Sequence, residues 1–415
     1  MLLTKNQLSL ALGCILLWVV AAAAPVQAGL YADSSHGDST NGVDRSTIAT
    51  GYSVYATGNC GHCHEQHASL DGAEPNPGTS VSAYLGFELE QDLCLTCHDG
   101  SPAATDIATQ FGTGKVKHPR LTTDGIHRAD ESTSSDFTGT NRHAECTDCH
   151  NPHVANAIVA PGYDATSAAK GPIIGATGVN PTNPSAGTTI SSYTFETVDD
   201  TFEQYKVCFK CHSSWTSNSR TTADEFNTNN DSYHYVEGDK SYTRKIASTA
   251  QFNTTYVGVM MTRYSGASNT VLRTAKMLCS DCHGPGSAGA EPEGVHGSDY
   301  AKILKVPNGS PFTSWSASSS IPSSTGSSSN VWCFNCHVKT FNGSGFDDND
   351  SGELHIGKHD GERCQDCHMA NPHGVATRKH LLDPTQFAES IDNYSEGNWS
   401  EDAHDNDLTG AAGCT

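Results

Sequence analysis

The pattern of apolar and polar positions is strongest at the N-terminus of the chain. Residues Leu8 to Ala24 form an almost continuous apolar run, with Lys5 before it and Val26-Gln27-Ala28 after it. A positive residue, an apolar run and a small-residue cleavage site are the parts of a secretory signal. We therefore predict a signal peptide at 1–28 and export of the rest of the chain. A lipid anchor at Cys14 is the alternative.

Periodic patterns in the rest of the chain are short, and none is long enough to cross a bilayer. The alternation of Thr189 to Val198 predicts a strand. Residues Thr201 to Cys211 have a helical pattern, and Asp200 is a suitable N-cap for it. Weaker patterns predict three further elements: a second hairpin around Thr254 to Tyr264, a short helix leading into Cys279, and a helix at Ser298 to Leu304.

The composition does not provide a conventional core. Leu, Ile, Val and Phe make up roughly 16% of the chain, and the formal net charge is −22. Such a composition is typical of disordered chains. An ordered fold would need apolar material from another source. The acidity disfavours nucleic acid as a partner, because phosphate binding requires basic patches.

One short pattern occurs seven times and supplies that source. Its spacing, Cys-x-x-Cys-His, is the attachment motif of c-type haem, in which the two cysteines bind the porphyrin covalently and the histidine binds the iron. The cysteine pairs are Cys60 and Cys63, Cys94 and Cys97, Cys146 and Cys149, Cys208 and Cys211, Cys279 and Cys282, Cys333 and Cys336, and Cys364 and Cys367. The proximal histidines are His64, His98, His150, His212, His283, His337 and His368.

Other interpretations of a Cys-x-x-Cys pair are a zinc half-site or a redox pair. Neither requires a histidine after every second cysteine. Fourteen of the 16 cysteines lie in the motifs, which leaves only Cys14 and Cys414. Three interpretations of Cys414 stay open: an exposed thiol, a cross-link between two chains, or the start of an incomplete eighth motif.

The chain resembles multihaem c-type cytochromes from Cys60 to about His380. Its doubled motifs are similar to those of exported cytochromes from metal-reducing bacteria, including extracellular filament-forming ones. The resemblance implies seven covalent haems and a mostly coil fold with short helices, a few β-hairpins and little side-chain core. We expect one heptahaem domain at 29–415, with a possible hinge in the serine-rich segment 310–330.

The second axial ligand of each iron must come from elsewhere in the chain. His62 lies inside a motif, so 13 histidines remain for seven irons. Methionine is the other common ligand, but Met260 and Met261 are better explained as apolar filling. We therefore predict bis-histidine ligation throughout. The distal candidates are His36, His67, His118, His153, His234, His296, His355, His359 and His373, with His127, His143 and His380 as reserves.

These features predict electron transfer along a chain of haems, through or beyond the cell envelope. Expected partners are envelope redox proteins, metal oxides or other extracellular acceptors, and further copies of the chain in a filament. In the filament hypothesis, His67 binds a final haem of another copy; otherwise it binds haem 2 of its own chain. The alternative function is a multihaem reductase of a small nitrogen or sulfur compound, which needs one open haem site.

Overall fold

The computed structural model describes short helices and strands joined by extended loops. The described residues are 31–48, 53–64, 90–118, 144–156, 171–216, 222–237, 252–287, 292–315, 330–338, 368, 372–377 and 381. The helices among them are α3 (Glu90–Leu95), α4 (Cys146–Cys149), α5 (Gln204–Phe209), α6 (Thr222–Glu225), α7 (Thr254–Met260), α8 (Asn269–Leu272) and α9 (Cys279–Cys282). Single 3-10 turns include η2 (Cys60–His62), η3 (Ala108–Phe111), η6 (Thr201–Glu203), η8 (Thr262–Tyr264), η9 (Ala301–Ile303) and η10 (Trp332–Asn335).

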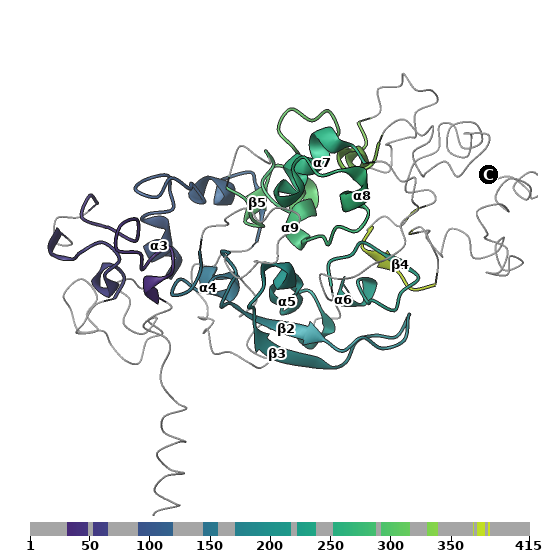
Figure 1. Ribbon diagram of the computed structural model, residues 1–415, viewed down its shortest axis with the longest axis horizontal. Helices are drawn as coiled ribbons and strands as arrows, with labels where there is room; N and C mark the ends of the chain where they lie inside the picture. Colours follow the sequence, from purple (N-terminus) through teal and green to yellow (C-terminus); the bar gives the residue numbers. More distant parts are fainter. Residues whose placement is uncertain are drawn as a thin grey trace, which may run out of the picture.

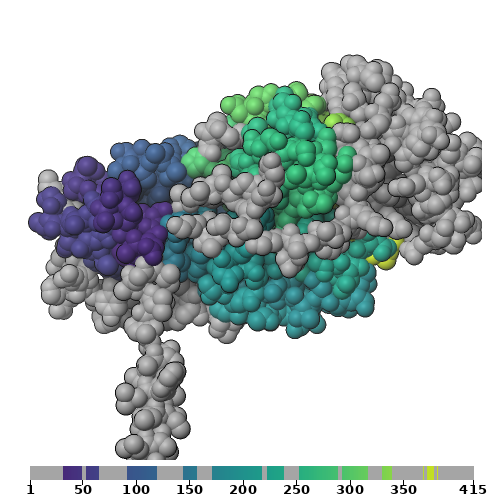
Figure 2. Space-filling view, in the orientation of Figure 1, coloured from purple at the N-terminus to yellow at the C-terminus, as the bar shows by residue number. Residues whose placement is uncertain are grey.

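The described elements follow the long axis of the molecule in approximately the order of the sequence. Figure 1 shows α3 near one end, then α4, then α5 with β2 and β3, and finally α7, α8 and β4 toward the other end. The space-filling view has the same progression of colours (Figure 2). The motif-bearing helices α3, α4 and α5 thus lie in sequence order along the axis, and α9 lies above α5 in this view.

Three two-stranded antiparallel sheets are present among the described residues. They pair β2 (Thr177–Pro181) with β3 (Tyr193–Thr197), β1 (Val116–Lys117) with β5 (Gly297–Ser298), and β4 (Ser232–Tyr233) with β6 (Gly374–Val375). The predicted strand at Thr189 to Val198 is confirmed in its second half. The last two sheets join segments far apart in the sequence, so they tie distant loops together.

The predicted helix after Asp200 is confirmed. The Asp200 side chain accepts a hydrogen bond from the Phe202 backbone N–H, and η6 continues into α5. The short helix predicted to lead into Cys279 instead begins at that residue, as α9. The segment Ser298 to Leu304 forms the end of β5 and the single turn η9.

The predicted hairpin at Thr254 to Tyr264 is wrong, because this segment forms α7 and η8. Its apolar residues explain the error. Val257, Met260, Met261 and Tyr264 follow the i, i+3, i+4, i+7 spacing of one helical face, and all four are buried in one cluster. The β-branched residues in the segment suggested a strand, but burial of this face decides the structure.

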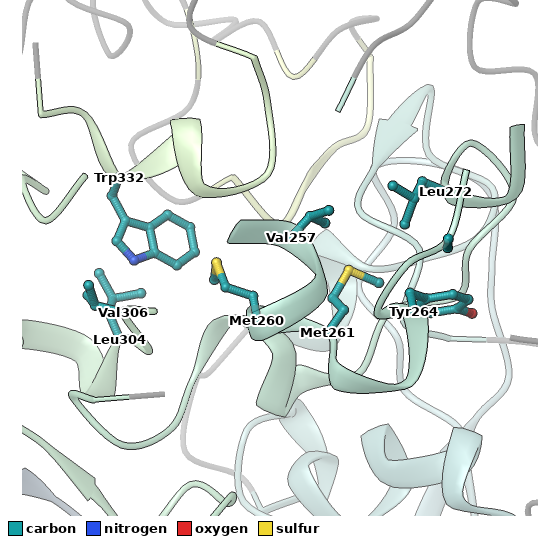
Figure 3. Packing of buried hydrophobic residues seen from close by; sticks show 9 residues of the cluster. Val257, Met260, Met261, Tyr264, Leu272, Leu304, Val306 and Trp332 are labelled. Carbon is teal, nitrogen blue, oxygen red and sulfur yellow. The ribbon is translucent and has the colours of Figure 1, made fainter. Parts of the chain in front are cut away.

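Buried apolar side chains gather in small clusters that contact the motif cysteines. Figure 3 shows the largest, in which Met260 and Trp332 pack among residues of α7, η8 and the 304–306 segment. Cys282 and Cys336 pack against this cluster, and Cys279 packs against a second one. The expectation that methionines 260 and 261 are apolar filling is confirmed by their burial. Among the described residues, no helix has the length and apolar character needed to cross a membrane.

One buried carboxyl group makes the fold sensitive to pH. Glu237 is 2% exposed and accepts a hydrogen bond from the Asn183 side-chain amide. Burial raises the pKa of Glu237 to about 8, although the Asn183 hydrogen bond and the charge of Lys276 oppose the rise. The protonated form is therefore favoured in the folded chain near neutral pH.

Glu237→Gln should flatten the pH dependence of stability. Between pH 4.5, the ordinary pKa of a glutamate, and about 8, the folded chain holds a proton that the unfolded chain has lost. Stability should thus fall as pH rises through this window. Since one pKa unit corresponds to about 1.4 kcal/mol, the loss is on the order of several kcal/mol.

Denaturant unfolding of both proteins at pH 5 and pH 9 measures this difference. Asp33→Asn, which removes an exposed carboxyl group, is the control and should behave as the wild type does. An equal loss of stability in the wild type and Glu237→Gln would contradict the prediction.

Candidate haem-ligating histidine pairs

Each described Cys-x-x-Cys-His motif folds into the same tight turn. In all six, the histidine backbone N–H donates to the carbonyl of the first cysteine, over 2.9 or 3.0 Å. This is the hydrogen bond of one helical turn, and it brings both cysteines and the histidine to one side of the backbone. Asp148 and Asp281 cap two of these turns, since their carboxylates accept from the backbone N–H groups of Glu145 and Leu278. None of the twelve described motif cysteines forms a disulfide bond.

The six motif histidines each face a different histidine from outside the motifs. The ring centroids of the pairs lie between 5.9 and 6.5 Å apart. The pairs are His64 with His153, His98 with His36, His150 with His296, His212 with His118, His283 with His373, and His337 with His234.

This spacing fits a single metal ion between two imidazole rings. Bonds from a metal to imidazole nitrogen are about 2 Å long, so two rings on opposite sides of one metal have centroids about 6 Å apart. Ordinary aromatic contacts have centroids about 4.5 to 7 Å apart, so the recurrence of one pair at each of the six motifs, rather than the distance alone, favours metal binding. Two histidines are also what the protein gives an iron whose other four ligands come from porphyrin. Within the described residues, no group of three His, Cys, Asp or Glu side chains is placed to hold a metal.

Hydrogen bonds at Nδ1 fix the orientation of these rings. Backbone carbonyls accept from Nδ1 of His36, His118, His150, His234 and His283. A carbonyl can only accept, so Nδ1 carries the hydrogen and Nε2 carries the lone pair that can bind a metal. Metal-binding histidines almost always make a hydrogen bond of this kind through the other ring nitrogen.

Side chains orient two further rings in the same way. The Gln110 side chain accepts from His296 Nδ1 over 3.1 Å, and its amide nitrogen donates to the Pro292 carbonyl. The Glu225 carboxylate accepts from His373 Nδ1 over 2.6 Å. Local sequence patterns could not identify Gln110 or Glu225, because the histidine that each one contacts is more than a hundred residues away in the chain.

Burial keeps many of these histidines neutral, the form that can bind a metal. It lowers the pKa of six rings, with neighbouring histidines adding to the effect. The pKa values of His296 and His337 fall to about 3, and those of His98, His150, His153 and His283 are also lowered.

The pairs are organised in three modules of two motifs each. The first module contains motifs 1 and 2, the second motifs 3 and 4, and the third motifs 5 and 6. In the second module, β1 and β5 place His118 directly opposite His296, and His118 N–H donates to the His296 carbonyl over 3.3 Å. In the third, β4 and β6 place His234 opposite His373 in the same way, over 2.8 Å.

One side-chain hydrogen bond recurs in every module. His36, His118 and His234 face the even-numbered motifs, and each donates from Nδ1 to a backbone carbonyl. In every case that carbonyl belongs to the residue just before the histidine that faces the odd-numbered motif. The acceptors are Pro152, Val295 and Pro372, which precede His153, His296 and His373. In each module, the two histidines from outside the motifs are therefore linked to each other by this hydrogen bond.

Electrostatic contacts join successive motifs into one series. Together with burial, Cys97 raises the pKa of Cys63, and Cys208 raises that of Cys149. A hydrogen bond to Cys279, with burial, raises the pKa of Cys208. The remaining links join His98 to His150, Cys282 to Cys336, and His337 to His368. Motifs 1 to 7 are thus neighbours in sequence order.

Six of the nine distal candidates are found opposite a motif histidine. His153 and His373, which follow motifs 3 and 7, face motifs 1 and 5 rather than an adjacent one. His98 faces His36 rather than His67. The candidates His67, His355 and His359, the reserves His127, His143 and His380, and the cysteines Cys364 and Cys367 lie outside the described residues.

Odd-numbered motifs face a histidine that comes later in the chain, and even-numbered motifs face one that comes earlier. The motif sequences contain a signal for this alternation. Motifs 3, 5 and 7 read Cys-x-Asp-Cys-His, whereas motifs 4 and 6 read Cys-Phe-x-Cys-His. The tripeptide Asn-Pro-His also occurs at both His153 and His373. No protein-family model matches the chain, and no curated protein or solved structure matches it.

Gly294 leaves the space that the His296 ring occupies. Its backbone has φ +138°, and a Cβ atom there would lie 2.5 Å from His296 Cε1. Gly309 also has a positive φ, of +74°, but a Cβ there would meet no atom within 4 Å. Both positions favour glycine for backbone reasons, but only Gly294 is set against a candidate ligand.

Gly294→Ala should displace His296 from its position opposite His150. In haem-loaded protein, we expect one of the seven irons to become high-spin, because the added methyl group occupies the place of the ring. Electron paramagnetic resonance of the oxidised protein gives the high-spin fraction. Gly309→Ala also places a side chain at a positive φ and should leave all irons low-spin, so equal spectra for the two variants would contradict this prediction.

Proposed function

We propose that this chain is an exported electron-transfer protein that carries seven covalent c-type haems, each with two histidine ligands. The observation that carries the proposal is the six facing histidine pairs, because every described motif has its own second histidine at metal-binding distance. When bound, haem supplies an iron that gains and loses one electron. The protein residues hold that iron on both sides and bury it.

Ligation on both faces favours electron transfer over catalysis. A reductase of a small molecule needs an iron with an open or easily displaced position. In five of the six described pairs, the second histidine is oriented by an Nδ1 hydrogen bond, and four of these five histidines also lie next to a paired strand. Two histidine ligands also give lower potentials than a thioether ligand would. Consecutive motifs are neighbours, which supports movement of electrons from one end of the elongated chain to the other.

The purified protein should contain seven haems, all of them low-spin. Intact mass spectrometry counts the haems, and electron paramagnetic resonance with carbon monoxide titration counts irons that have an open position. We expect no carbon monoxide binding at neutral pH, since both axial positions are filled. A mass without haem would refute the proposal. Seven haems with about one full equivalent of carbon-monoxide-binding iron would favour the reductase.

The site of action follows from the N-terminal segment and the charge. The signal-peptide pattern at 1–28 supports export, so we propose a periplasmic or extracellular location. Acceptors of matching chemistry are cationic redox proteins, metal ions and metal oxides, because the chain is strongly acidic. No nucleic acid is expected as a partner.

The iron of motif 7 also needs a second histidine, and we propose that another copy of the chain supplies it. The irons of motifs 1 and 2 are served by His153 and His36, so His67 is not needed by either of them. We propose that His67 binds the iron of motif 7 in another copy. Such a head-to-tail contact does not close on itself and produces a filament. His355 or His359 of the same chain is the alternative ligand.

His67→Ala distinguishes these two arrangements. If His67 bridges copies, the variant should lose its fibres in electron microscopy, and about one of seven irons should become high-spin. His404→Ala removes a histidine outside the proposed ligand set and is the matched control. A wild type that stays monomeric at high concentration with seven low-spin haems would refute the bridge without affecting the electron-transfer proposal.

A further inference from the structure

Each of the three modules contains a buried cation next to its motifs. Arg45 in the first module is 5% exposed, Lys210 in the second is 2% exposed, and Lys305 in the third is 1% exposed. Burying a positive charge costs free energy unless the surroundings compensate for it. Lys206 and Lys276 are buried as well, but each of these three cations donates a hydrogen bond to a motif residue.

Lys210 connects the two motifs of the second module. It lies between the cysteines of motif 4, and its Nζ donates to the backbone carbonyl of Asp148 in motif 3 over 2.6 Å. Its other acceptor is the hydroxyl of Thr177, over 3.1 Å. These two contacts place the ammonium group of a motif 4 residue beside motif 3.

Lys305 connects the motifs of the third module through its backbone and its side chain. Its N–H donates to the Cys282 carbonyl over 2.8 Å, and its carbonyl accepts from the Trp332 indole over 2.9 Å, just before motif 6. The Nζ atom donates to the Met260 carbonyl and forms an ion pair with Glu293. The Glu293 carboxylate offsets part of this charge.

Arg45 has the same relation to the first module. Its guanidinium Nη1 donates to the carbonyl of His62 inside motif 1 over 2.9 Å. The backbone N–H of Arg45 also donates to Nδ1 of the His62 ring over 3.2 Å. Arg45 is thus held against motif 1 by two hydrogen bonds.

Lys210 has the most direct position of the three. Its side chain starts inside motif 4, and its Nζ reaches the backbone of motif 3. The Nζ of Lys305 instead forms an ion pair with the Glu293 carboxylate.

We propose that these buried cations raise the reduction potentials of haems in their module, and that Lys210 acts on both haems of the second module. The inference rests on the proposed function. Reduction adds one electron to an iron site, and a nearby positive charge favours the reduced state. Its field is strong because the surroundings are buried and of low dielectric constant. In this acidic chain, the cations make these haems easier to reduce than the net charge alone would.

Lys210→Met tests the proposal, because it removes the charge and keeps a side chain of similar length. The measurement is a spectroelectrochemical titration of the haem-loaded protein, after haem content and spin state have been determined. At a fixed potential, we expect the ratio of reduced to oxidised iron to fall about tenfold for two of the seven haems, which corresponds to about 59 mV. The other five haems should titrate as in the wild type.

Two control variants isolate the buried charge. Lys117→Met removes the same charge next to His118, a ligand of the same module, but Lys117 is exposed, so water and salt should screen its effect to less than about twofold. Lys210→Arg keeps the charge and should titrate close to the wild type. An equal shift in Lys210→Arg and Lys210→Met, or in Lys117→Met and Lys210→Met, would overturn the proposal.

The remaining outcomes separate this inference from the proposed function. If Lys210→Met holds seven low-spin haems and titrates as the wild type does, the inference fails and the proposed function stands. If the wild type itself lacks haem, both fail. If Lys210→Met does not fold, Lys305→Met replaces it. A smaller shift to lower potential in two haems would support the proposal, and no shift would overturn it.

Discussion

Two imidazole rings held about 6 Å apart form the constraint on which the rest of this structure depends. This distance occurs six times among the described residues, once at each of six motifs. Each pair joins segments far apart in the sequence. The apolar clusters are small and pack against the motif cysteines. In this fold, side-chain packing surrounds the histidine pairs rather than forming a separate core.

The hydrogen bonds at Nδ1 link one pair to the next. In each module, one non-motif histidine donates to the backbone carbonyl just before the other non-motif histidine. A displacement of one histidine would therefore displace the other. The same contact fixes the ring's tautomer. Two-residue strands would be marginal as isolated sheets, yet β1 with β5 and β4 with β6 each place two ligands. The main effect of these short sheets is to hold two histidines of each module opposite each other.

The sequence was informative about local structure and much less so about pairing. The helix after Asp200 could be predicted because its cap and period lie within a dozen residues, and the turn of each motif follows from its spacing. The hairpin predicted at Thr254 to Tyr264 was wrong because β-branched residues concealed a helical period. Six of the nine candidate distal histidines face a motif histidine, and the short supply of histidines made these candidates easy to select. Their assignment to particular motifs depends on contacts between distant segments, such as His118 with His296, which local patterns do not encode. The alternation of Cys-x-Asp-Cys-His with Cys-Phe-x-Cys-His was the one available signal.

On the proposed function, the order in which the histidine pairs can form during export depends on which member of each pair comes first in the sequence. His36, His118 and His234 precede the motifs that they face, so their partners emerge from the membrane after them. His153, His296 and His373 follow their partners instead, by about ninety residues or more. On the proposed function, each odd-numbered iron thus remains open on one side until a later stretch of polypeptide arrives. A protein that ends as a closed conductor would pass through states with reactive irons, and its maturation would need to keep small ligands and oxidants away from them.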